Sequence, residues 1–197
     1  MEFPSFIAQA PTIKLYDPLA HVLGTCKDGL ITFEYKDLIK IAGHSCPTVA
    51  GAYTMAHIGL SKLYKEKNPI RGEINVLLKD AKNIGSTGVI ASVLGTITGA
   101  SDEGGFKGLN GNFSRINKLG FRAQIPSDVR LVRTDTDEYV DMSLHLDNLP
   151  QDKRLQTYFT DAISFEEDAL THFWEAWHGR VKSVLFEYER YGIVSIM

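Results

Sequence analysis

Two stretches of the chain contain no Asp, Glu, Lys or Arg, and they constrain the fold more than any other feature. They cover residues 41–61 and 84–101, and both are rich in Gly, Ala, Ser and Thr. Their length approaches that of a membrane-spanning helix. Small residues are, however, often fully buried in globular proteins. We therefore expect two tightly packed interior segments, a protein that does not enter a membrane, and a single folded domain around them.

The composition narrows the classes of function. The chain has 197 residues, of which 44% are hydrophobic and 23% charged, as in ordinary globular proteins. A net charge of -3 and the lack of any Lys/Arg-rich block argue against nucleic acid as a partner. Two cysteines, Cys26 and Cys46, are too few for a disulfide framework, although one bridge between them is open. The N-terminus lacks the basic region of a signal peptide, so we expect a cytoplasmic protein.

Hydrophobic periodicity and turn residues predict an alternation of helices and strands without regular βα units. We expect helices at 18–25, 35–42, 47–67, 88–97, 152–160 and 165–188, and strands at 30–34, 73–78, 113–122, 129–133 and 139–146. The β-branched content of 88–97 leaves a strand open there. This pattern favours an α+β fold, with a mixed or antiparallel sheet packed against helices. We place one domain at 1–197, with a core at 17–146 and a helical C-terminal extension at 150–197.

The sequence Gly43-His44-Ser45-Cys46-Pro47 carries the most reactive side chains of the chain. Pro47 fits the first position of a helix, which puts Cys46 at the N-cap. Unpaired N–H groups and the helix dipole favour a thiolate there, the form that binds metals or attacks electrophiles. His44 and Cys46 are therefore candidate metal ligands. Alternatively, Cys46 is a catalytic nucleophile with His44 as its base, or both residues are purely structural.

A zinc site needs three or four protein ligands, and this turn supplies two. We expect the others from His21 and Cys26, which precede the turn. His57 and the acidic residues Asp80, Asp102 and Glu103 are alternatives.

A glycine-dense segment at 99–113 predicts a shaped loop. Backbone N–H groups of such loops bind anions, and we expect Gly105, Phe106 and Lys107 to contact an anionic ligand. The plainer interpretation is a tight loop whose glycines adopt positive φ.

The C-terminal helix has an aromatic seam that includes Phe173 and Trp177, and a polar stripe on its other side. The seam is typical of a core or a dimer interface. Trp174 and Trp177 are also candidates for a docking surface on an enzyme complex. The polar stripe is most simply exposed to solvent.

Two blocks of the sequence resemble the family of the E-type subunit of formylmethanofuran dehydrogenase. They are Gly43-His44-Ser45-Cys46-Pro47 and the segment from Thr87 to Gly108, and the similarity spans roughly residues 17 to 122. The resemblance implies the α+β core of that family, a homodimer, and a His/Cys site for a transition metal, commonly zinc. The zinc-finger module of some members is absent.

Together these features predict a protein that binds a metal, zinc or iron, and a small molecule. It is open whether the protein is an enzyme. The alternative is a non-catalytic carrier of a metal or of haem, or an accessory subunit of a redox enzyme complex, since imidazole and thiolate both suit haem iron.

Overall fold

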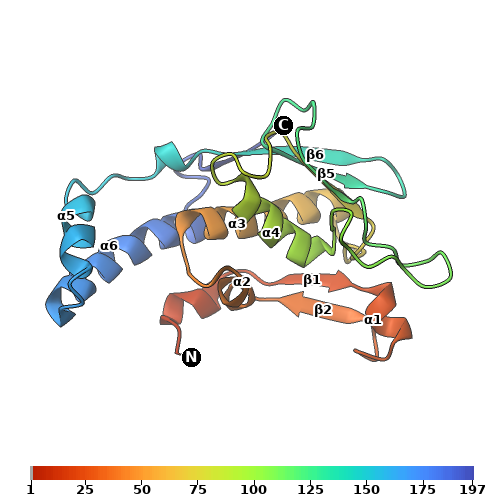
Figure 1. Cartoon of the computed structure of the whole chain (residues 1–197), viewed down its shortest axis with the longest axis horizontal. Coiled ribbons are helices and arrows are strands. Elements are labelled where there is room, and N and C mark those ends of the chain that lie inside the picture. Colours follow the sequence, from red (N-terminus) through yellow and green to blue (C-terminus); the bar gives the residue numbers. More distant parts are fainter. Residues whose placement is uncertain (1) are drawn as a thin grey trace.

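The computed structural model describes residues 2–197 and shows an α+β protein in three layers (Figure 1). A five-stranded sheet forms one outer layer, in the order β4-β3-β5-β6-β7. Its strands are β3 (Ile74–Leu78), β4 (Leu119–Gly120), β5 (Val129–Arg133), β6 (Tyr139–Leu144) and β7 (Val194–Ile196). Only β3 and β4 run parallel, and the other pairs are antiparallel. The predicted α+β class is confirmed.

Helices α3 (Pro47–Tyr64) and α4 (Thr87–Thr98) form the middle layer, and they contain most of the two uncharged stretches. Gly51 and Gly59 allow α3 to lie close to the sheet, since a Cβ on either would overlap the side chain of Leu144 or Met142. Most of α3 is buried on several faces, so it needs no polar stripe. The expectation of interior segments is thus confirmed. No helix in residues 2–197 combines the length and hydrophobicity needed to span a bilayer.

A two-stranded hairpin and two helices cover the other side of the middle layer (Figure 1). The hairpin consists of β1 (Ile13–Tyr16) and β2 (Leu30–Phe33). The two helices are α1 (Pro18–Val22), which lies between these strands in the chain, and α2 (Tyr35–Ala42), which follows them. Alternate residues of β1 face the core, and Leu15 is fully buried. A short 3-10 helix, η1 (Ser5–Gln9), precedes β1.

The C-terminal segment is tied to the core at two places. After η2 (Leu146–Asn148), α5 (Leu155–Ala162) and the first half of α6 (Glu167–Phe186) form a helical arm that projects from the body (Figure 1). The second half of α6 buries Val181, Val184 and Leu185 against the core, where it contacts α3. Beyond it, β7 pairs with β6 at the edge of the sheet.

The structure lacks one expected strand and has two that were not expected. Residues 113–122 do not form the expected strand, since only Leu119–Gly120 pair with β3. Phe113 and Asn117 adopt positive φ, a conformation that a strand does not allow. The other predicted helices and strands are present, Tyr35–Ala42 and Val129–Arg133 with the expected ends and the rest with shifted ends, and 88–97 is a helix. Strands β1 and β7 are additional.

Candidate functional site

Residues 43–47, which we call the His44 turn, take their shape from the end of α2 and the start of α3. Gly43 ends α2 in the left-handed conformation, at φ 78°. Cys46 is extended, at φ -146°, and is the N-cap of α3, with Pro47 directly after it. The Cys46 sulfur accepts a hydrogen bond from the Val49 N–H at 3.5 Å. The predicted position of the thiol at a helix N-terminus is therefore confirmed.

The hydrogen bond of His44 fixes which ring nitrogen is free. Its Nδ1 lies 3.0 Å from the Ala42 carbonyl oxygen, and the side chain is exposed. A carbonyl oxygen only accepts, so the neutral imidazole must carry its proton on Nδ1. Nε2 is then the unprotonated nitrogen, as in histidines that ligate metals through Nε2.

His44 and Cys46 bond to the backbone in opposite directions along the chain. His44 bonds back to Ala42, and Cys46 accepts forward from Val49. No hydrogen bond joins the two side chains in the described part of the chain. An activated thiol–imidazole pair would need such a bond. This arrangement therefore shows no nucleophile–base pair at the turn.

Ser45 holds the turn to two other elements. The Tyr35 hydroxyl lies 2.9 Å from Ser45 Oγ, and the Trp177 indole N–H donates to the Ser45 carbonyl oxygen at 2.8 Å. Burial raises the pKa of Tyr35 well above its ordinary value, so the phenol stays protonated. Because α2, α3 and α6 all reach this turn, its backbone is fixed from three sides.

The other expected ligands lie elsewhere. His21 belongs to α1, and its Nδ1 lies 2.9 Å from the Tyr16 hydroxyl. Cys26 lies in the turn between α1 and β2. Figure 1 shows α1 and α2 at opposite ends of the β1–β2 hairpin. Both cysteines are free. Within residues 2–197 no three or more His, Cys, Asp or Glu side chains are grouped closely enough to hold a metal ion.

A cleft of about 600 Å³ lies between α1, α4 and the glycine-dense loop. Its wall is formed by Leu19, Arg71, Ala91, Ser92, Gly95, Thr96, Gly99, Ala100, Ser101, Asp102, Phe106, Arg115 and Leu119, and we call it the arginine cleft. Of the three residues expected to contact an anionic ligand, Phe106 lines this cleft, whereas Gly105 and Lys107 are not part of its wall. Gly105 packs against Ser101 so closely that a Cβ would overlap it, which fits the tight-loop interpretation.

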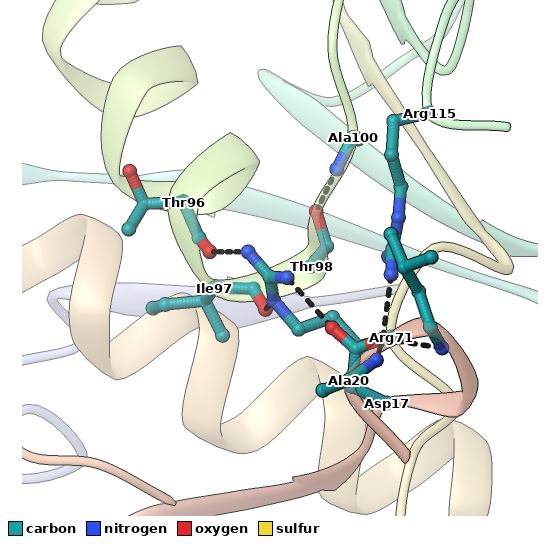
Figure 2. Close-up of polar contacts among 9 residues, drawn as sticks. Asp17, Ala20, Arg71, Thr96, Ile97, Thr98, Ala100 and Arg115 are labelled. Carbon is teal, nitrogen blue, oxygen red and sulfur yellow. Dashed lines mark hydrogen bonds and ion pairs between the residues drawn. The ribbon is translucent and has the colours of Figure 1, made fainter. Parts of the chain in front are cut away.

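One carboxylate pairs with both arginines of the cleft (Figure 2). Asp17 is the N-cap of α1, and its Oδ2 accepts from Arg71 Nη1 at 2.8 Å while its Oδ1 accepts from Arg115 Nη2 at 2.7 Å. Arg71 also donates to the carbonyl oxygens of Thr96 and Ile97 at the end of α4. These contacts join α1, α4 and two loops into one polar cluster.

Arg115 is the most buried charged side chain of this cluster after Asp17. It is 6% exposed, and its Nη1 is buried without a hydrogen-bond partner. Gly72 and Gly99 make room for it, since a Cβ on either would collide with Nη1. Burial lowers the pKa of Arg115, which the charge of Asp17 partly offsets. The guanidinium is thus desolvated and incompletely paired, a costly arrangement in a protein interior.

Sequence reasoning missed Asp17, Arg71 and Arg115. The pairs are 54 and 98 residues apart, and no spacing along the chain signals them. The one local signal was Asp17 directly before Pro18, a typical start of a helix.

No protein-family model matches the chain, and no curated protein matches it. The family resemblance accordingly rests on the motifs of the His44 turn and of the segment from Thr87 to Gly108.

Proposed function

We propose that this protein binds a transition metal, zinc or iron, at the His44 turn and that the metal takes up a small molecule. One observation carries the proposal: the bond between Nδ1 and the Ala42 carbonyl leaves Nε2 as the unbonded ring nitrogen of an exposed histidine, two residues before a cysteine at a helix N-terminus. A backbone carbonyl on the distal nitrogen is the usual support of a metal-bound histidine. The anchors on Ser45 supply the rigidity that such a centre requires.

The two ligands of this turn are fewer than the four of a structural zinc site and the three of a catalytic one, so a metal held here would be open to water or substrate. Structural zinc sites have four protein ligands, whereas catalytic sites keep a position for water or substrate. A metal held at this turn would act as a Lewis acid toward an oxygen atom of a bound molecule. His44 and Cys46 would hold it, and Tyr35 and Trp177 would position the turn through their bonds to Ser45.

The alternative function is that of a non-catalytic carrier of a metal or haem, or an accessory subunit of a redox complex. The arm favours it, because Phe165 is 80% exposed and Trp174 49% exposed there. Exposed aromatic side chains are typical of docking surfaces. An absorption spectrum of freshly purified protein separates the two functions, since a Soret band indicates haem. Sedimentation of the same sample tests the homodimer expected from the family resemblance.

Elemental analysis of untagged protein tests metal binding. We expect stoichiometric zinc or iron in the wild type and its loss in His44→Gln and Cys46→Ser. His21→Gln and Cys26→Ser are matched controls that should keep the metal. In Trp177→Phe, loss of the bond to Ser45 should weaken metal affinity by about tenfold, while Trp174→Phe should leave it unchanged.

Metal-free wild type after purification in zinc- and iron-supplemented medium would contradict the proposal. So would a metal that survives both His44→Gln and Cys46→Ser. Metal loss in the His21 and Cys26 variants would instead restore the four-residue ligand set expected from the sequence.

A further inference from the structure

The arginine cleft has more hydrogen-bond donors than the protein satisfies. Asp17 Oδ1 accepts from the Leu19 and Ala20 N–H groups as well as from Arg115, and its Oδ2 accepts from Arg71. A carboxylate has about four acceptor positions, so Asp17 is fully used. Arg115 donates one hydrogen bond, to Asp17, and its Nη1 has none. The cluster therefore has a surplus of positive charge. Nη1 itself is closed to solvent and packs against Gly72 and Gly99, so a bound group would compensate the guanidinium charge rather than contact that atom.

The charges around the cleft leave it able to accept an anion. Within the cluster, two guanidinium groups face one carboxylate. The other acidic side chain of the wall, Asp102, is paired with Lys82 at 3.5 Å. Glu73 acts on Arg115 only weakly and makes no ion pair with it. A negative group in the cleft would compensate the guanidinium charge that burial has stripped of water.

The rest of the wall is apolar or small. Leu19, Ala91, Leu119 and the half-exposed ring of Phe106 surround the arginines, and Gly95 and Gly99 add no side chain. A volume of about 600 Å³ falls in the usual range for small-molecule sites. Such a wall accommodates a small hydrocarbon or aromatic body next to a charged head.

We propose that the arginine cleft binds a small organic oxyanion, whose carboxylate or phosphate head lies against Arg71 and Arg115 and whose apolar body packs against Phe106 and Leu119. Planar guanidinium groups match both head groups geometrically. The site shares no residue with the His44 turn, so it stands independently of the proposed metal centre.

Calorimetric titration of the full chain with three probes tests this site. Phenylacetate, phenyl phosphate and benzyl alcohol share an aromatic body and differ in the head group. We expect at least one charged probe to bind the wild type about tenfold or more tightly than benzyl alcohol. The tighter of the two charged probes identifies the head group.

Two variants locate the binding. Arg115→Met should weaken the charged probe by about tenfold or more, and Arg154→Met, at an exposed arginine outside the cleft, should not. Should Arg115→Met fail to fold, Ser92→Trp provides the same test. Ser92 is exposed on α4 and lines the cleft, so an indole there fills the cavity without touching Asp17. The metal content of the Ser92→Trp variant should equal that of the wild type.

Three results would overturn the proposal. They are the absence of binding by both charged probes, equal binding of benzyl alcohol, and binding that Ser92→Trp leaves unchanged.

Discussion

The His44 turn and the arginine cleft are built in opposite ways. The turn consists of five consecutive residues, and its shape follows from a helix end, a helix start and a proline. The cleft depends on Asp17 meeting arginines 54 and 98 residues away. Reactive residues in a turn can be recognised from local chemistry, whereas a buried charge cluster exists only once the chain has folded.

The two regions also differ in how strongly the stability of the fold depends on their side chains. His44 is exposed and bonds to its own neighbourhood, so its replacement leaves no buried group without a partner. Asp17 is 2% exposed and Arg115 6% exposed, and each depends on the other for charge compensation. We therefore expect the cleft to dominate stability and the turn to be tolerant of substitution.

The largest effect should come from Asp17→Ala. It removes the cap of α1 and leaves a buried and a half-buried guanidinium without their carboxylate, so the free energy of unfolding should fall by about 3–5 kcal/mol. Asp135→Ala is the control, because Asp135 pairs with Arg133 at the surface. Its cost should stay below about 1 kcal/mol. Urea unfolding measures both, and equal losses would remove the contrast between buried and exposed pairs.

A pair of glycine substitutions compares the two regions directly. Gly43 and Gly99 have almost the same φ, 78° and 76°. A Cβ at Gly43 meets nothing within 4 Å, whereas at Gly99 it collides with Arg115. Gly43→Ala should cost about 1–2 kcal/mol for the left-handed backbone alone. Gly99→Ala adds about 1–3 kcal/mol of overpacking, measurable by thermal or urea unfolding. A smaller loss for Gly99→Ala would show that Arg115 is free to move.

Lowering the pH should reduce the stability of the fold by less than these substitutions do. Burial raises the pKa of Asp17, but hydrogen bonds from Arg71 and Ala20 and the charge of Arg115 outweigh it, so the net pKa lies below 3.8. The hydrogen bond from Arg130 likewise lowers the pKa of Asp141. Folded-state pKa values below the unfolded ones contribute stability above about pH 4 that is lost as the pH falls through them.

The urea concentration at the midpoint of unfolding should therefore stay constant as the pH is lowered to about 5. It should decrease once the pH is below about 4. Asp17→Asn removes one of the two carboxylates and should flatten this decline without abolishing it. An unchanged pH profile in that variant would mean that Asp17 keeps an ordinary pKa in the folded protein.

Much of the fold could be predicted because local signals and tertiary contacts agree. Tyr35–Ala42 was expected with the observed ends, since Gly43 stops that helix in the left-handed conformation. Cys46 and Pro47 likewise fixed the start of α3. The strand expected at 113–122 failed because positive φ at Phe113 and Asn117 turns the backbone into the loop that delivers Arg115.

In the candidate sites, too, features set by neighbouring residues could be predicted and features set by distant contacts could not. The position of the thiol at the N-cap of α3 followed from its neighbours. The tautomer of His44 and the Trp177 anchor did not, because the first depends on one backbone carbonyl and the second joins residues 132 positions apart. The pairing of Asp17 with Arg115 has no sequence pattern, since ion pairs between residues far apart in the chain have no characteristic spacing.

The bond between Trp177 and Ser45 has a consequence for biosynthesis. When the ribosome has added residue 176, the imidazole and the thiol of the motif are already made, but the indole that holds their turn is not. Because chains emerge from the N-terminus, this turn acquires its Trp177 anchor only after its own side chains have been made. A transcript truncated before α6 would encode the complete motif and produce it without one of its supports.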